Sequence, residues 1–222
     1  EPVAGVVASS EEIAQEAVQL VEVEYEELPA IFDPFEGAQP DATLIHPDLG
    51  EYQVANFIFP QPGSNVSEHF KLRRGDVEAA WPHCAAIVEG EFRLPQIQHV
   101  PIEPHIAISW WDEDERLVIR TSTQVPFHAR RMLAPVLDLP IKRIRVIKPR
   151  IGGGFGGKQE VMIEDVAAHL TIATGRPVIY EYTREEEFIA ARSRHPMIIR
   201  MKTGVKNDGT ITANEMYAMS DN

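Results

Sequence analysis

The stretch Ile151-Gly152-Gly153-Gly154-Phe155-Gly156-Gly157-Lys158-Gln159-Glu160 contains five glycines. Glycine lacks a Cβ, so this backbone can approach a ligand closely and can adopt positive φ. A β-branched run over residues 144–147 precedes the loop, and a helical pattern over about 160–174 follows it. A helix start beside the loop would offer free N–H groups to an anion, a phosphate or a metal-bound oxygen. A tight turn without a ligand is the simpler alternative, and spacing alone leaves it open.

Two nucleotide-binding patterns overlap the same loop. Gly152, Gly154 and Gly157 satisfy G-x-G-x-x-G, the dinucleotide fingerprint. The preceding chain, however, is patterned as a hairpin and a helix, and no acidic residue ends a strand about 20 residues further on. Residues 152–158 also satisfy G-x-x-x-x-G-K, but a P-loop then needs Ser or Thr for magnesium, and this chain has Gln159. A phosphate loop at 152–158 therefore stays as an alternative with weak support.

Working outward, hydrophobic periodicity predicts both strands and helices on each side of the loop. Towards the N-terminus it predicts a strand at 86–94, a hairpin of 106–111 with 117–121, and a helix over 126–137. Towards the C-terminus it predicts a strand at 178–182, a helix from a Thr183–Glu186 capping box to about 191, and a hairpin of 198–205 with 210–219. Over residues 1–32 the periodicity predicts a strand, a helix and a second strand, and Ser9 with Glu12 forms a second capping box. This mixture indicates an α+β fold.

Composition excludes several classes of protein. The 222 residues are 44% apolar and 25% charged, which is typical of a globular protein with one large domain or two small ones. A single cysteine, Cys84, excludes an internal disulfide and a multi-cysteine metal site. No apolar run approaches the roughly 20 residues that a bilayer needs. A net charge of −13 argues against nucleic acid or an anionic membrane as the main partner.

The chain begins without Met and stops inside a predicted strand, which favours a piece of a longer polypeptide.

Six motifs occur in a fixed order along the chain. They are GDVEAA at 75–80, HVPIEPH at 99–105, STQ at 122–124, the glycine loop, TGRPV at 174–178 and SRHP at 193–196. Together they resemble the molybdenum-binding subunit of the xanthine dehydrogenase and aldehyde oxidase family, and the resemblance covers nearly the whole chain. It implies that residues 1–50 are the C-terminal part of an α/β hammerhead domain and that 51–80 are a linker. Residues 81–222 are then the first part of a molybdopterin-binding α+β domain.

The resemblance also implies roles for individual residues. Gln124 would hydrogen-bond an oxygen ligand of molybdenum, since its side-chain amide can donate without adding charge. Phe155 and Gly156, with Gly154 before them, would lie against the molybdenum centre with their backbone amides facing it. Gln124 and Phe155 would thus lie beside the metal without ligating it. Gln159 would face the substrate, at a position where purine-hydroxylating members often have glutamate.

Three other polar residues receive plainer interpretations. Lys158 is expected to be a cation that faces solvent or phosphate, with no catalytic role. Glu103 is interpreted as a carboxylate that closes a loop. His105 and the other histidines are not spaced as a metal-binding cluster.

The implied parent enzyme hydroxylates an N-heterocycle or an aldehyde with oxygen derived from water. Molybdenum–molybdopterin would be its cofactor, and electrons would pass to 2Fe–2S clusters and FAD on other segments or subunits. The general-base glutamate of the family lies beyond residue 222, so we expect no catalytic residue and no activity in these 222 residues alone. The resemblance further implies a cytoplasmic, dimeric parent. A nucleotide-binding domain and a non-catalytic scaffold remain as the alternatives.

Overall fold

The computed structural model describes residues 2–52, 54 and 58–221. The chain folds into two compact units, and each is built from separate stretches of sequence. The loop unit comprises Glu1–Glu24 and Ile97–Arg194, and the ribbon unit comprises Tyr25–Gln96 and His195–Asn222. The glycine loop and all the residues of the predicted site belong to the loop unit.

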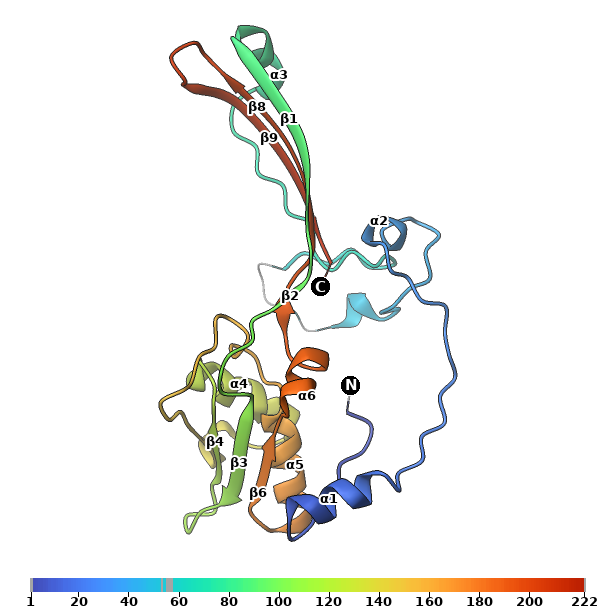
Figure 1. Cartoon of the computed structure of the whole chain (residues 1–222), viewed down its shortest axis with the longest axis vertical. Coiled ribbons are helices and arrows are strands. Elements are labelled where there is room, and N and C mark those ends of the chain that lie inside the picture. Colours follow the sequence, from blue (N-terminus) through green and yellow to red (C-terminus); the bar gives the residue numbers. More distant parts are fainter. Residues whose placement is uncertain (1, 53, 55–57, 222) are drawn as a thin grey trace. The chain divides into compact units, whose positions relative to one another are not determined.

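A four-stranded sheet forms the centre of the loop unit (Figure 1). Its strand order is β5 (Ile144–Ile147), β4 (Leu117–Thr121), β3 (Ile106–Trp111) and β6 (Val178–Glu181). β3 pairs antiparallel with both β4 and β6, whereas β4 and β5 run parallel. A parallel pair needs a crossover connection, and the helix between β4 and β5 provides it.

Two helices, α4 (Pro126–Val136) and α5 (Glu164–Thr174), pack against this sheet. Their shared core consists of Leu117, Ile119, Leu133, Leu137, Ile144 and Ala168. The Ser109 hydroxyl on β3 donates to the Ala167 carbonyl of α5 at 2.9 Å, which fixes the helix over the strand. Gly175 ends α5 in the left-handed conformation, with φ of 65°.

The remaining elements of the loop unit are short. They are α1 (Glu11–Val18), β2 (Ile97–Gln98), η3 (Ile141–Arg143), α6 (Arg184–Ile189) and β7 (Ser193–Arg194). β2 and β7 pair antiparallel, so the segment before the site is tied to the segment after α6. The Thr183–Glu186 capping box at the start of α6 is confirmed.

The ribbon unit is built on the antiparallel sheet β1 (Ala86–Leu94), β8 (Met197–Val205) and β9 (Ile211–Ser220). Four short helices belong to it: α2 (Pro34–Gly37), η1 (Leu49–Glu51), α3 (Val77–Ala80) and η2 (Trp81–His83). One face of the sheet carries a Glu89, Lys202 and Glu215 row, and the Lys202 Nζ lies 3.0 Å from Glu89.

Several predictions near the N-terminus are wrong. The strands expected within residues 1–32 do not form, because no partner strand pairs with the described part of this segment. The helix there is capped by Ser10 rather than Ser9, and the Ser10 hydroxyl accepts from the Ile13 N–H. From 58 to 76 the predicted linker has no regular structure, and positions 53 and 55–57 of it lie outside the described residues. A mixed α and β fold is confirmed.

The helix after the glycine loop begins at Glu164 rather than about Glu160. Its N-terminus therefore does not adjoin the loop, and the expected helix-dipole site for an anion is absent there. In the part of the chain that the structure describes, no helix combines the length and apolar character needed to cross a bilayer.

Candidate functional site

Gln124 follows β4 and is attached to the glycine loop at three points. Its Oε1 accepts from the backbone N–H of Gly156 at 3.0 Å and of Lys158 at 3.2 Å. Its own backbone N–H donates to the Lys158 carbonyl at 2.8 Å. Both groups that meet the amide are N–H donors, so the amide atom facing them must be oxygen. The Nε2 group is left as a donor without a partner among the described residues.

The loop backbone approaches Gln124 so closely that a side chain cannot be added at Gly154. A Cβ built there would lie 2.5 Å from the Gln124 Oε1 and 2.7 Å from its Cδ. Two residues further on, Gly156 has φ of 99°, a conformation that few L side chains adopt. Glycine is therefore required at 154 because a side chain would collide with Gln124, and at 156 because the backbone has a positive φ.

Phe155 lies between these glycines and is 73% exposed. Its φ is 53°, which is uncommon outside glycine and asparagine. The ring therefore lies outside the core. A strained residue that exposes a large apolar ring is a feature of binding sites.

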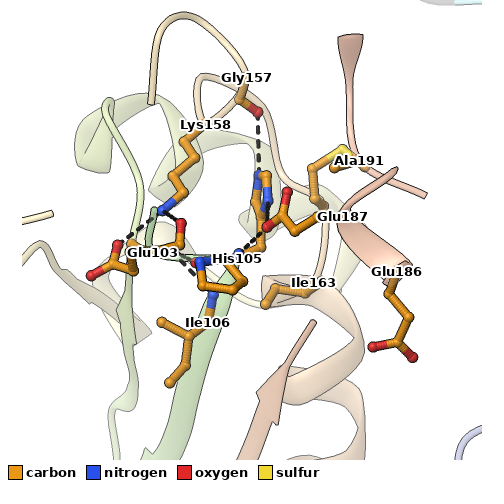
Figure 2. A network of polar contacts seen from close by, with 12 residues as sticks. Glu103, His105, Ile106, Gly157, Lys158, Ile163, Glu186, Glu187 and Ala191 are labelled. Carbon is orange, nitrogen blue, oxygen red and sulfur yellow. Dashed lines mark hydrogen bonds and ion pairs between the residues drawn. The ribbon is translucent and has the colours of Figure 1, made fainter. Parts of the chain in front are cut away.

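Lys158 is buried, contrary to the expectation of a cation facing solvent or phosphate. Its Nζ donates to the Glu103 carbonyl at 2.7 Å and to the Glu103 Oε1 at 2.9 Å (Figure 2). The prediction that Glu103 closes a loop is confirmed, because its backbone N–H also donates to the Gly152 carbonyl at 3.3 Å. An ammonium group held in this way cannot reach a phosphate, so the P-loop alternative is not supported.

A second buried pair lies beside the first. His105 Nδ1 is 2.7 Å from the Oε1 of Glu187, and its Nε2 is 3.2 Å from the Gly157 carbonyl (Figure 2). His105 and Glu187 are both almost fully buried. Both ring nitrogens face oxygen atoms, and the Glu187 Oε1 also accepts from the His105 backbone N–H. The sequence analysis predicted neither the His105–Glu187 contact nor the burial of Lys158. The only trace of these contacts in the sequence is that Glu103 and His105 are two residues apart.

Gln159 and Glu160 end the loop and are exposed. Glu160 forms an ion pair with Arg192, with 2.7 Å between the carboxylate Oε2 and the guanidinium Nε. The Gln159 side chain is available to a ligand. It lies at the end of the loop that contains Gly154, Phe155 and Gly156 and that Gln124 contacts.

The polar groups of the loop fit an anionic or oxygen-rich ligand. The backbone N–H groups of Gly153, Gly154 and Phe155 have no hydrogen-bond partner in the described chain. Successive free N–H groups with alternating conformations bind anions. Among the residues with described positions, no three His, Cys, Asp or Glu side chains converge on a metal-ion site.

Known proteins resemble this chain over most of its length. The sequence pattern of the molybdopterin cofactor-binding domain family matches residues 58–222. A probable hypoxanthine oxidase of Escherichia coli O157:H7 is 42% identical over 96% of this chain and 25% of its own length. The nicotinate dehydrogenase large molybdopterin subunit of Eubacterium barkeri is 33% identical over 99% of this chain and 48% of its own.

Solved structures show the same fold. The aldehyde oxidoreductase of Desulfovibrio gigas superposes with a TM-score of 0.82 at 28% identity, over 96% of this chain and 22% of its own. The chain thus spans about a quarter of the length of the first of these relatives. On the match over 58–222, the chain belongs to the molybdopterin cofactor-binding domain family.

Proposed function

We propose that this chain forms one wall of the active site of a molybdenum hydroxylase of the xanthine dehydrogenase and aldehyde oxidase type. The observation that carries the proposal is the Gln124 amide. Its oxygen is held by two loop N–H groups, and its Nε2 is left to donate to an oxygen of the bound cofactor. When bound, the molybdenum–molybdopterin group supplies the oxidation that adds oxygen from water to the substrate.

The other loop residues support the cofactor in simpler ways. The free N–H groups of Gly154 and Phe155 are placed to donate to it, and the glycine at 156 keeps the backbone close. The exposed Phe155 ring excludes water from one side of the centre. Gln159 contacts the substrate, and because its amide both donates and accepts, it recognises a different hydrogen-bond pattern from a glutamate.

We infer the rest of the parent enzyme from its relatives. Their names include a hypoxanthine oxidase, a nicotinate dehydrogenase and an aldehyde oxidoreductase, which supports an N-heterocycle or an aldehyde as substrate. Iron–sulfur and FAD groups on other segments or subunits would take the electrons. The general base would lie outside these 222 residues, in a dimeric, cytoplasmic enzyme. Residues 1–50 would complete a hammerhead domain.

The molybdenum content of the complete polypeptide that contains this chain tests the proposal. We expect about one molybdenum per polypeptide, as for a metal that takes part in the reaction. A bound nucleotide without molybdenum would overturn the proposal, and the absence of both would favour a scaffold.

Gln124→Glu gives a sharper test of the amide. Glutamate keeps the oxygen that accepts from Gly156 and Lys158 but replaces the donating Nε2 with a second acceptor. We expect normal molybdenum content with turnover lowered about 10²-fold, the usual effect of removing one preorganised donor. Gln19→Glu, at an exposed glutamine at the end of α1, is the matched control. Unchanged turnover in Gln124→Glu at full metal loading would contradict the role.

A further inference from the structure

The proposed function leaves the buried Lys158 charge without a purpose. The Lys158 side chain has no exposed surface, and its partner Glu103 is 30% exposed. Lysine is almost never fully buried unless it is paired, because desolvation of an ammonium group is unfavourable. A neutral residue of the same length would fill this space without that cost. The charge therefore does something that packing alone does not explain.

Glu103 connects the two ends of the glycine loop. Its backbone N–H donates to the carbonyl of Gly152, the first glycine. Its carbonyl and carboxylate oxygens accept from the Nζ of Lys158, the residue after the last glycine. A Cβ at Gly152 would lie only 2.7 Å from the Glu103 Cβ, so the contact at that end is also close.

Lys158 in turn carries the attachment of Gln124. The Lys158 N–H donates to the Gln124 Oε1, and the Lys158 carbonyl accepts from the Gln124 N–H. The Thr123 hydroxyl donates to the same carbonyl at 3.4 Å. Anchoring the lysine side chain therefore fixes the backbone groups that orient the Gln124 amide.

We propose that Glu103 and Lys158 are positioning residues, whose buried ion pair closes the glycine loop and thereby aims the Nε2 of Gln124. The inference rests on the proposed function for its consequence on turnover, but the closure of the loop stands on the contacts alone. The proposal assigns the pair no contact with the cofactor or the substrate. The His105 and Glu187 pair holds Gly157 independently, so the loop unit retains a second anchor when Lys158 is changed.

The test uses the complete polypeptide with Lys158→Met, which removes the charge and keeps the chain length. Lys142→Met, at an exposed lysine without an ion pair in the described chain, is the matched control. The first readout is hydrogen exchange of peptides covering 152–159, because the N–H groups of Gly156, Gly157 and Lys158 are all bonded within the site. We expect at least about tenfold faster exchange in Lys158→Met and no change in the control.

The second readout is a double-mutant cycle with Gln124→Glu. If Lys158 acts on turnover through the Gln124 Nε2, Lys158→Met lowers kcat/KM in the wild-type background and adds nothing once that donor is gone. Equal factors in the two backgrounds would overturn the positioning role. Exchange at the control rate would overturn it as well.

A second variant covers the case in which Lys158→Met does not fold. Glu103→Gln keeps an oxygen for Nζ and the backbone carbonyl, so the contact persists without the opposing charge. Faster loop exchange in Glu103→Gln supports the proposal, and exchange at the wild-type rate overturns it. A polypeptide without molybdenum would contradict the proposed function. The hydrogen-exchange rates would still test whether the Glu103–Lys158 pair closes the loop. Full molybdenum loading, with loop exchange in the variants equal to that of the wild type, would contradict the positioning role and leave the proposed function intact.

Discussion

At the scale of single residues, the site depends on contacts that leave no room for a side chain. Gly154 is the clearest case, because the Gln124 amide lies where its Cβ would be. The glycine-rich stretch at 152–157 indicated a ligand-binding loop, and the resemblance to the xanthine dehydrogenase and aldehyde oxidase family indicated a role for Gln124. Neither could indicate that the two touch, since they are thirty residues apart in sequence. The contact exists because β4 ends beside the loop that follows β5.

Gly154→Ala tests this contact. The added methyl must displace the Gln124 amide or the loop backbone, and a displacement of about 1 Å near the reacting atoms can lower the rate about 10²-fold. We expect kcat/KM to fall by roughly that factor, measured on the complete enzyme. Gly37→Ala, where a Cβ would meet Ile31 at an ordinary 3.5 Å, should leave activity unchanged. Equal activities for the two variants would contradict the packing argument.

The burial of Lys158 is a second residue-scale feature that sequence reasoning missed. Lysine is expected at the surface, and its partner Glu103 is far away in the chain. Only the folded chain shows that the two charges neutralise each other. Removing one partner of such a pair leaves an uncompensated buried charge, which typically costs about 3–5 kcal/mol of stability. Lys158→Met removes the buried charge itself and so avoids this penalty, whereas Glu103→Ala does not.

At the scale of elements, local periodicity predicted strands better than helix starts. β1, β3, β4 and β5 have the predicted bounds. α5 begins later than predicted, because the Glu164 carboxylate accepts from the N–H groups of Met162 and Ile163 and thereby closes a turn. The other Glu164 oxygen accepts from the Thr121 hydroxyl on β4. This buried carboxylate sets the helix start by a tertiary contact that periodicity does not show.

The capping box of α6 was predicted from sequence and has a measurable effect. The Thr183 hydroxyl accepts from the Glu186 N–H, and the Glu186 carboxylate accepts from the Thr183 N–H. Thr183→Ala should destabilise α6 by about 1 kcal/mol. Since α6 carries Glu187, hydrogen exchange should accelerate in α6 and at the contact with His105. Thr43→Ala, at an exposed threonine, is the control, and identical exchange in both would exclude a capping contribution.

At the scale of the whole molecule, each unit is assembled from distant stretches. The sheet order β5-β4-β3-β6 places β6 next to β3, although two strands, β4 and β5, and the helices α4, η3 and α5 lie between them in sequence. In the ribbon unit, β1 pairs with β8, more than a hundred residues later. Such pairings depend on which edges remain free after the hairpins form, so they are properties of the assembled chain.

Stability against pH is a whole-molecule property that one buried tyrosine should influence. Burial and neighbouring carboxylates raise the pKa of Tyr182 from 10.0 to about 12. The native state therefore keeps a proton that the unfolded chain releases between those two values. Stability from this group is complete below pH 10 and declines as the pH rises towards 12.

Tyr182→Phe should weaken this decline. Denaturation midpoints measured at increasing pH should fall less steeply between pH 10 and about 12 in the variant than in the wild type. The tyrosinate absorbance of the wild type should also contain a late component that Tyr182→Phe removes. Tyr25→Phe, at an exposed position, should change neither measurement. Parallel pH curves for wild type and Tyr182→Phe would contradict the assignment.

The amino-acid sequence by itself determined most of the strands after residue 85, the mixture of helices and strands, the position of the glycine loop and, through six ordered motifs, the molybdopterin-binding family. These depend on short-range periodicity, turn residues and motif spacing, which are all present along the chain. The tertiary structure alone decided that Lys158 is buried against Glu103, that His105 meets Glu187, and that the Gln124 oxygen faces the loop. Those contacts join residues far apart in sequence. They form because charges removed from water must find partners wherever the fold brings them.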